Sequence, residues 1–197
     1  SEILDASAAT FGRGYYPSMG IRTALPSNKD GALFCLYMQP LVGDSISYKS
    51  VIDDFIALYP GSYEGYVSKA EYEAVVLRDM SAAEHSWDKA FELAENPAEV
   101  HFGKSKSINA IIMQGDTVSH PMLSLANALA EIDKAIAGDA QSLYISTKAD
   151  ILFSHGDFAA AAECYRQLAS TDMRGAEVFA KASQCYRNAG SYEESVA

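Results

Sequence analysis

The sequence predicts an all-α fold, and more specifically an α-solenoid of antiparallel helix pairs. Two observations lead to this prediction. The turn Gly156-Asp157-Phe158 recurs as Gly190-Ser191-Tyr192, which places the two glycines 34 residues apart. Apolar residues spaced by four and then three positions, which share one face of a helix, also recur at about this interval. A period of this length is typical of helical repeats, whose helix pairs bury their apolar faces against neighbouring pairs.

Residues 1–30 are expected to lie outside the repeats. Ser1 to Phe11 carries an apolar stripe at helical spacing and predicts a single helix. Residues 12–30 are rich in glycine, proline and asparagine, and this composition predicts an irregular connection. Connections of this length are either functional or merely irregular, and the sequence leaves both readings open. A repeat domain is expected to follow at residues 31–197.

Five repeats are expected in this domain, the last of them truncated. Each repeat should hold two helices joined by a turn. Pro40 should end or kink the first helix, because proline removes a backbone donor. Residues 116–124 should hold an insertion before the second helix of the third repeat. The expected repeats are about 31–61, 62–97, 98–140, 141–175 and 176–197, with helices in the first three at 31–41, 45–59, 63–78, 81–95 and 97–114.

An apolar trio marks the second helix of each of the first four repeats. The first members of the trios are separated by 32, 45 and 33 residues (51 to 83, 83 to 128, 128 to 161). Unrelated amphipathic helices would share the spacing within a trio, but they would not share the interval between trios. The interval therefore indicates a repeat. The trios are Val51/Phe55/Leu58, Ala83/Trp87/Ala90, Ala128/Ile132/Ala135 and Ala161/Tyr165/Leu168.

Over Gly31 to Ala197 the sequence resembles the tetratricopeptide repeat family. Small residues stand where the two helices of a repeat would cross, because a larger side chain would hold the helices apart. The resemblance implies a right-handed superhelix whose concave face is built from the first helix of each repeat. It rests on Ala149 and Ser183 in first helices, and on Ala161, Tyr165 and Ser195 in second helices. The sequence departs from the family pattern at Val51, Ile108, Lys148 and Met173.

The resemblance also implies where a partner would bind. Hydroxyl, amide and aromatic side chains on the concave face suit hydrogen bonding to an extended or helical peptide, although a plainly solvated surface is the alternative. Some family members clamp a terminal carboxylate with lysines and asparagines. Only Asn109 matches that pattern, so no such clamp is expected. By register, the concave face comprises Ser68, Tyr72, Ser105, Asn109, Ser146, Asp150, Gln184 and Arg187.

No catalytic residue, metal site or cofactor is expected. The four histidines share no metal-ligand spacing, and neither a phosphate-binding loop nor a nucleophile elbow occurs. Cys35, Cys164 and Cys185 form no CxxC motif and are expected to be small buried hydrophobic residues. A bridge between Cys164 and Cys185 is allowed but not implied.

The formal charge of −11 bears on the partners. A negative field repels phosphate backbones, so a nucleic acid is not expected to bind. No apolar run approaches the ~18 residues that a membrane span needs. The lack of a signal segment slightly favours the cytoplasm, whereas a signal segment removed from the chain would allow an extracytoplasmic location.

These observations predict a non-catalytic, tetratricopeptide-type scaffold that binds a protein or peptide on its concave face. The alternative is the helical regulatory portion of a larger multidomain enzyme, receptor or glycan-handling protein, because the chain ends inside a predicted helix at Tyr192 to Ala197. An unfinished last repeat would also expose Val178, Phe179 and Tyr186. We therefore expect self-association through that end.

Overall fold

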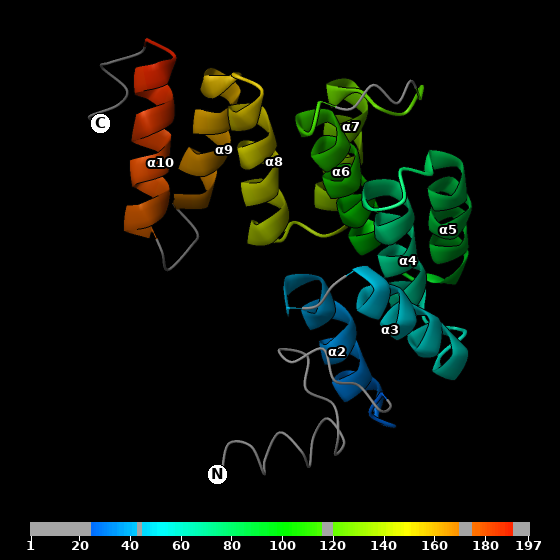
Figure 1. Cartoon of the computed structure of the whole chain (residues 1–197). Helices are drawn as coiled ribbons and strands as arrows, with labels where there is room; N and C mark the ends of the chain where they lie inside the picture. Colours follow the sequence, from blue (N-terminus) through cyan, green and yellow to red (C-terminus); the bar gives the residue numbers. More distant parts are fainter. Residues whose placement is uncertain (1–24, 43–44, 116–119, 170–174, 191–197) are drawn as a thin grey trace. The chain divides into compact units, whose positions relative to one another are not determined.

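The structure is a computed structural model that describes residues 25–42, 45–115, 120–169 and 175–190. Within these ranges the regular secondary structure is α-helical, and neighbouring helices form antiparallel pairs (Figure 1). The predicted all-α class of helix pairs is confirmed. The chain divides into two compact units, Ser1–Glu95 and Asn96–Ala197. The predicted division into five repeats of one domain and the right-handed superhelix both stay predictions. The helices predicted at 1–11 and 192–197 lie outside the described residues.

Two helix pairs form the described part of the first unit. Helix α2 (Lys29–Val42) packs on α3 (Ser45–Leu58), and α4 (Tyr63–Val75) packs on α5 (Met80–Leu93). The two pairs meet where α3 approaches α4 at Gly65. A Cβ atom at Gly65 would lie 2.9 Å from side-chain atoms of both Phe55 and Ile56. Because close-packed interiors leave little room for an added methyl group, a larger residue here would force the side chains of Phe55 and Ile56 to shift.

The core of the first unit draws on several helices. Leu36 of α2 and Phe55 of α3 are fully buried, and Tyr72 of α4 joins the same cluster. Tyr48 meets Tyr72 edge-on, with ring centroids 5.8 Å apart, a geometry that aromatic pairs favour. Trp87 is fully buried in α5, which packs on α4. Burying side chains of this size contributes about 1.5–3 kcal/mol each.

Helix pairs also stack in the second unit. Helix α6 (Ala98–Met113) packs on α7 (Leu125–Gly138), and α8 (Ser142–Ser154) packs on α9 (Phe158–Ala169). Helix α10 (Gly175–Asn188) packs on α9, while α7 contacts α8. A cluster with members on α8, α9 and α10 forms one core, which includes Ala149, Leu152, Ala161, Tyr165, Ala182 and Cys185.

The apolar trios form the buried side of the second helices, with one exception. Every trio member in α5, α7 and α9 is buried, as are Val51 and Phe55 in α3. Leu58, however, is 53% exposed. It is the last residue of α3, two residues before Pro60, and so it lies at the edge of the packed surface. Spacing alone could not reveal that the packed face ends there.

Of the helix ends that differ from those expected, two have a clear physical reason. Pro40 does not end α2, which continues to Val42. A proline in the last turn removes one hydrogen bond next to the point where the helix ends anyway, and its cost is small there. Helix α4 ends at Val75 rather than at Arg78. The backbone of Arg78 has a φ of 60°, which no α-helix accommodates.

One backbone position recurs after α4, α6, α8 and α10. Among the described residues, positive φ angles occur at Arg78 (60°), Gly115 (66°), Gly156 (84°) and Gly190 (80°). Glycine adopts this conformation freely, and it commonly ends helices in this way. An Asp or Ser follows each of the four positions. Asp79, for example, caps α5 by accepting a hydrogen bond of 2.9 Å from the backbone N–H of Ala82. The three glycines each lie two residues after their helix ends and so give α6, α8 and α10 a common register, whereas Arg78 lies three residues after α4 ends.

Arg78 is the one residue in this series that is not glycine, and substituting it tests the left-handed backbone conformation at this position. We expect Arg78→Gly to have a free energy of unfolding about 1 kcal/mol higher than Arg78→Ala, because only alanine retains the steric cost of the left-handed conformation. Comparing these two variants cancels the loss of the arginine side chain, which both share. Urea titration followed by circular dichroism measures the difference. An alanine variant as stable as the glycine variant would contradict the assigned backbone conformation.

Candidate functional site

A groove lies between α6 and α8, the first helices of two successive pairs in the second unit. Its volume is about 310 Å³, near the lower end of the range for ligand sites. Each helix contributes four lining residues at spacing i, i+3, i+4 and i+7, which is one face of an α-helix. The lining residues are Lys106, Asn109, Ala110 and Met113 from α6, and Thr147, Asp150, Ile151 and Ser154 from α8.

These residues occupy matching places in the two helices. Each lies nine, six, five or two residues before the positive-φ glycine that follows its helix, Gly115 or Gly156. Each lining residue of α6 therefore recurs 41 residues later on α8 (106 and 147, 109 and 150, 110 and 151, 113 and 154). The same places on α10, counted back from Gly190, hold Lys181, Gln184, Cys185 and Asn188.

The base of the groove is apolar. Ile151 is buried and Ala110 half-buried, whereas Met113 exposes about half of its surface. The hydroxyl groups of Thr147 and Ser154 each donate to a carbonyl of their own helix at 2.8 Å, so they are engaged locally. Lys106 places its Nζ 5.1 Å from the centroid of the Phe102 ring, in cation–π contact. An occupant would therefore meet an apolar base flanked by Asn109 and Asp150.

Asn109 and Asp150 each accept a hydrogen bond from a neighbouring side chain. His155 Nε2 donates to Asn109 Oδ1 at 2.9 Å. The Tyr165 hydroxyl donates to Asp150 Oδ1, and Lys181 Nζ lies 3.8 Å from the same oxygen. Burial, together with the bond to the Asp150 carboxylate, raises the pKa of the Tyr165 hydroxyl well above its usual range. Tyr165 therefore remains a protonated donor.

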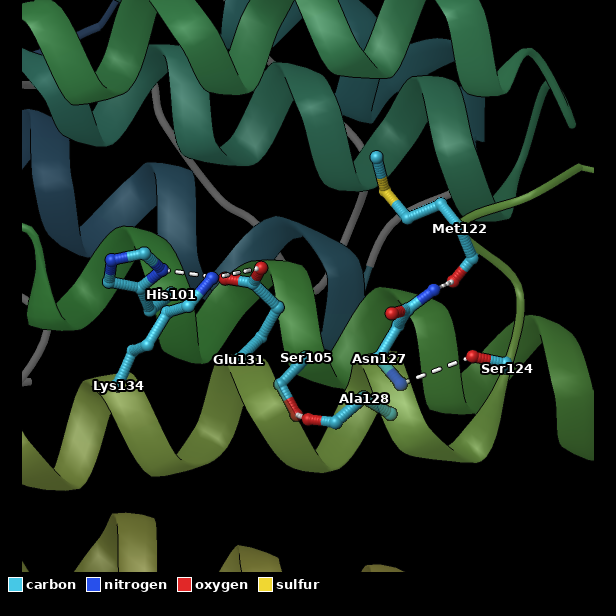
Figure 2. Close-up of polar contacts among 8 residues, drawn as sticks. All are labelled: His101, Ser105, Met122, Ser124, Asn127, Ala128, Glu131 and Lys134. Carbon is cyan, nitrogen blue, oxygen red and sulfur yellow. Dashed lines mark hydrogen bonds and ion pairs between the residues drawn. The ribbon is translucent and has the colours of Figure 1, made fainter.

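A second polar cluster joins α6 to α7 (Figure 2). His101 Nδ1 lies 2.6 Å from Glu131 Oε2, and Lys134 Nζ lies 3.0 Å from Glu131 Oε1. Burial alone would raise the pKa of the Glu131 carboxyl. The hydrogen bonds from His101 and Lys134 and the charge of Lys104 outweigh burial, and the pKa is lowered. Glu131 is therefore ionised at neutral pH and links its two helices.

Two further contacts in Figure 2 fix the start of α7. Ser124 caps the helix by accepting a hydrogen bond of 3.1 Å from the backbone N–H of Asn127. The Asn127 side chain donates to the carbonyl of Met122, also at 3.1 Å. Together they tie the preceding loop to the helix.

The Glu131 cluster makes stability depend on pH. Because the folded-state pKa of Glu131 is lowered, its contribution is fully present above the unfolded pKa of about 4.3 and is lost as pH falls through the folded value. We expect Glu131→Gln to lower the free energy of unfolding by about 1–3 kcal/mol at pH 7, as for a lost hydrogen bond to a charged group. The difference from the unmodified protein should shrink at acidic pH, as measured by urea titration at several pH values. A difference that is independent of pH would contradict the role of the charge.

Of the residues predicted to form the concave face, three are buried. Ser68, Tyr72 and Ser105 are 3%, 8% and 0% exposed, so the expectation of exposed side chains is wrong for them. Ser105 instead donates to the carbonyl of Ala128 in α7 at 2.7 Å, and Tyr72 packs on Tyr48. Ser68 and Ser105 lie ten residues before Arg78 and Gly115. Periodicity cannot distinguish this edge of the helix from the exposed edge beside it.

The other five predicted residues are more accessible. Asn109 and Asp150 line the groove. Ser146 is half-buried outside the lining and donates to the carbonyl of Leu143 at 2.9 Å. Gln184 and Arg187 are exposed on α10. Binding of a partner by these residues stays a prediction.

Sequence reasoning missed most of the groove lining. The missed residues could have been predicted from the sequence, because they follow from counting back from Gly115 and Gly156 at helical spacing. At two positions the predicted residue was Ser105 or Ser146, whereas the next residue, Lys106 or Thr147, lines the groove. The missed residues are Lys106, Ala110, Met113, Thr147, Ile151 and Ser154.

The side chains that could bind a metal ion are dispersed over the described residues. In that part of the chain, no group of three or more His, Cys, Asp or Glu side chains could hold a metal ion. Cys35, Cys164 and Cys185 are free thiols, and burial raises the pKa of Cys164 and Cys185. The reactive thiolate forms of Cys164 and Cys185 are therefore disfavoured at neutral pH. None of the described helices has both the length and the apolar character required to cross a membrane.

The predicted exposed end of the second unit is only partly apolar. Phe179 is 51% exposed on α10, whereas Val178 and Tyr186 pack against the core shared with α8 and α9. Self-association through this end stays a prediction.

Comparison with known proteins gives no family assignment. No family model matches this sequence, and no curated protein matches it. One similar solved structure comes from work entitled "Functional Characterization of Pseudomonas Aeruginosa pilF". It is 12% identical to this chain, and the match covers 85% of this chain and 87% of that one, with a TM-score of 0.36. A likeness at this level supports no conclusion about fold or function, and membership of the tetratricopeptide family stays a prediction.

Proposed function

We propose that this protein is a non-catalytic scaffold that holds a peptide segment of a partner protein in the groove between α6 and α8. The observation that carries the proposal is the matched pair of helix faces, which combine an apolar base with two oriented polar side chains, Asn109 and Asp150. Peptide grooves of proteins characteristically combine these two elements.

The size and charge of the groove favour a peptide. A volume of about 310 Å³ suits one or a few side chains rather than a large cofactor. The formal charge of −11 disfavours nucleic acids and strongly acidic segments. The groove contains one basic and one acidic residue, Lys106 and Asp150, so it presents no single-sign patch.

Selection from a random displayed peptide library on the immobilised protein tests this proposal. We expect enrichment of peptides that share an apolar position, and we expect these peptides to lose binding when the groove is filled by Ala110→Trp. Peptides that bind the filled variant equally well would place the interaction elsewhere and overturn the proposal. A selection that yields no binding peptide would also overturn it.

A further inference from the structure

We infer that His155 and Tyr165 are positioning residues. They orient the hydrogen-bonding atoms of Asn109 and Asp150 so that the groove binds the main chain of an extended peptide segment. The inference deepens the proposed function and rests on it. Neither residue lines the groove. Each acts through one that does, His155 through Asn109 and Tyr165 through Asp150.

The amide of Asn109 has one oxygen acceptor and two N–H donors. Its oxygen already accepts from His155 Nε2, which holds the amide in one of its two flipped orientations. The atom left to serve an occupant is therefore Nδ2, a donor. Without the imidazole, the amide could rotate and present either an acceptor or a donor.

The carboxylate of Asp150 is held in a comparable way. Its Oδ1 accepts from the Tyr165 hydroxyl, and Lys181 approaches the same atom. The side chain is 59% exposed, and Oδ2 is the oxygen left to serve an occupant. Asp150 therefore offers an acceptor and Asn109 a donor, one on each of the two helices that line the groove.

A donor and an acceptor on facing helices complement the C=O and N–H groups of an extended main chain, which are unpaired along their length. A helical segment uses these groups in its own i to i−4 hydrogen bonds and would offer the groove only side chains. The apolar base of Ala110, Ile151 and Met113 would receive one side chain of the segment. Because the free acceptor is an anionic oxygen and the chain carries −11, the occupant is a segment without net negative charge.

Single substitutions test the positioning role, with peptides from the library selection as the probe. We expect His155→Ala and Tyr165→Phe each to weaken binding about tenfold, the worth of one oriented hydrogen bond. His155→Gln retains an N–H donor and should restore part of the loss. Matched controls are His85→Ala and Tyr66→Phe in the first unit, which should leave the affinity unchanged. Calorimetry measures the affinities, and circular dichroism confirms that each variant is folded.

Two double experiments separate positioning from a merely structural role. In an Asn109→Ala background, His155→Ala should cause no further loss, because the residue it orients is absent. N-methylation of the peptide backbone, one position at a time, should weaken binding about tenfold or more at one position. In an Asp150→Ala variant, N-methylation at that same position should have no effect.

Several outcomes would overturn the inference while leaving the proposed function intact. One is an unchanged peptide affinity in both His155→Ala and Tyr165→Phe. Another is a loss of affinity from His155→Ala that is as large in the Asn109→Ala background as in the unmodified protein. A third is a peptide that binds equally well when any backbone position is N-methylated. A bound peptide that is helical by NMR would overturn it as well. If no library peptide binds through the groove, the proposed function falls and this inference falls with it.

Discussion

Replacing Trp87 by alanine is expected to lower the free energy of unfolding of the first unit by about 3–5 kcal/mol, the usual cost of removing a large buried aromatic side chain. Trp87 is fully buried in α5, and it is the single tryptophan of the chain. Its loss leaves a cavity against α4 that close-packed helices can fill only in part. Since whole domains are stable by only about 5–15 kcal/mol, the α4–α5 pair should be largely unfolded at moderate urea concentrations.

Urea titration followed by circular dichroism measures this loss. His85→Ala on the same helix is the matched control, because His85 is exposed and its Nδ1 lies 2.7 Å from the carbonyl oxygen of Ser81, one turn earlier on the same helix. We expect the control to change stability by less than about 0.5 kcal/mol. A loss below about 1 kcal/mol for Trp87→Ala would contradict the burial of this residue at the centre of a helix pair.

Filling the groove with Ala110→Trp is expected to weaken peptide binding by about 100-fold or more, equivalent to about 2.7 kcal/mol. Ala110 is half-buried and lies on the apolar base of the groove. An indole at this position would occupy much of the 310 Å³ that an incoming side chain needs. The helix itself should tolerate the change, because the new side chain points into open space and not into the core.

The matched control for this variant is Ala130→Trp, which makes the same substitution at an exposed position of α7. It should leave both the affinity and the stability unchanged. Equal losses in the two variants would indicate a general effect of adding tryptophan rather than occlusion of the groove. Retained affinity in Ala110→Trp would place the binding surface elsewhere.

Much of the fold could be predicted because helix ends and buried helix faces leave local signals in the sequence. Gly156 and Gly190 are visible in the sequence as turn residues, and the structure gives both a positive φ. The equivalent position held by Arg78 was not recognised, because an arginine carries no sign of a left-handed conformation. Leu58 shows a second limit. Its helical spacing matches that of the buried residues, and only the tertiary packing shows that it lies beyond the core.

The groove was predictable in part. Asn109 and Asp150 follow from the repeat register, and both line the groove. Ser105 lies one turn earlier on α6, but its hydroxyl faces α7, a choice that depends on how the two helices are rotated against each other. Repeat spacing does not determine that rotation.

The positioning contacts were not predictable from sequence. His155 lies 46 residues from Asn109, and Tyr165 lies 15 residues from Asp150. Tyr165 was predicted to be the aromatic residue of a second helix, and its side chain is part of a buried core. That its hydroxyl reaches a groove residue depends on the three-dimensional stacking of α8 and α9. No pattern in the sequence signals such a contact.

The most direct test of the account uses the methyl groups of methionine. Met113 lies in the groove, whereas Met38 and Met80 lie in the first unit. Protein labelled at methionine methyl groups can be titrated with a selected peptide and followed by NMR. We predict that the Met113 methyl signal shifts in step with binding, while the signals of Met38 and Met80 stay in place. Saturable binding that leaves Met113 unmoved would contradict the assignment of the groove as the peptide site.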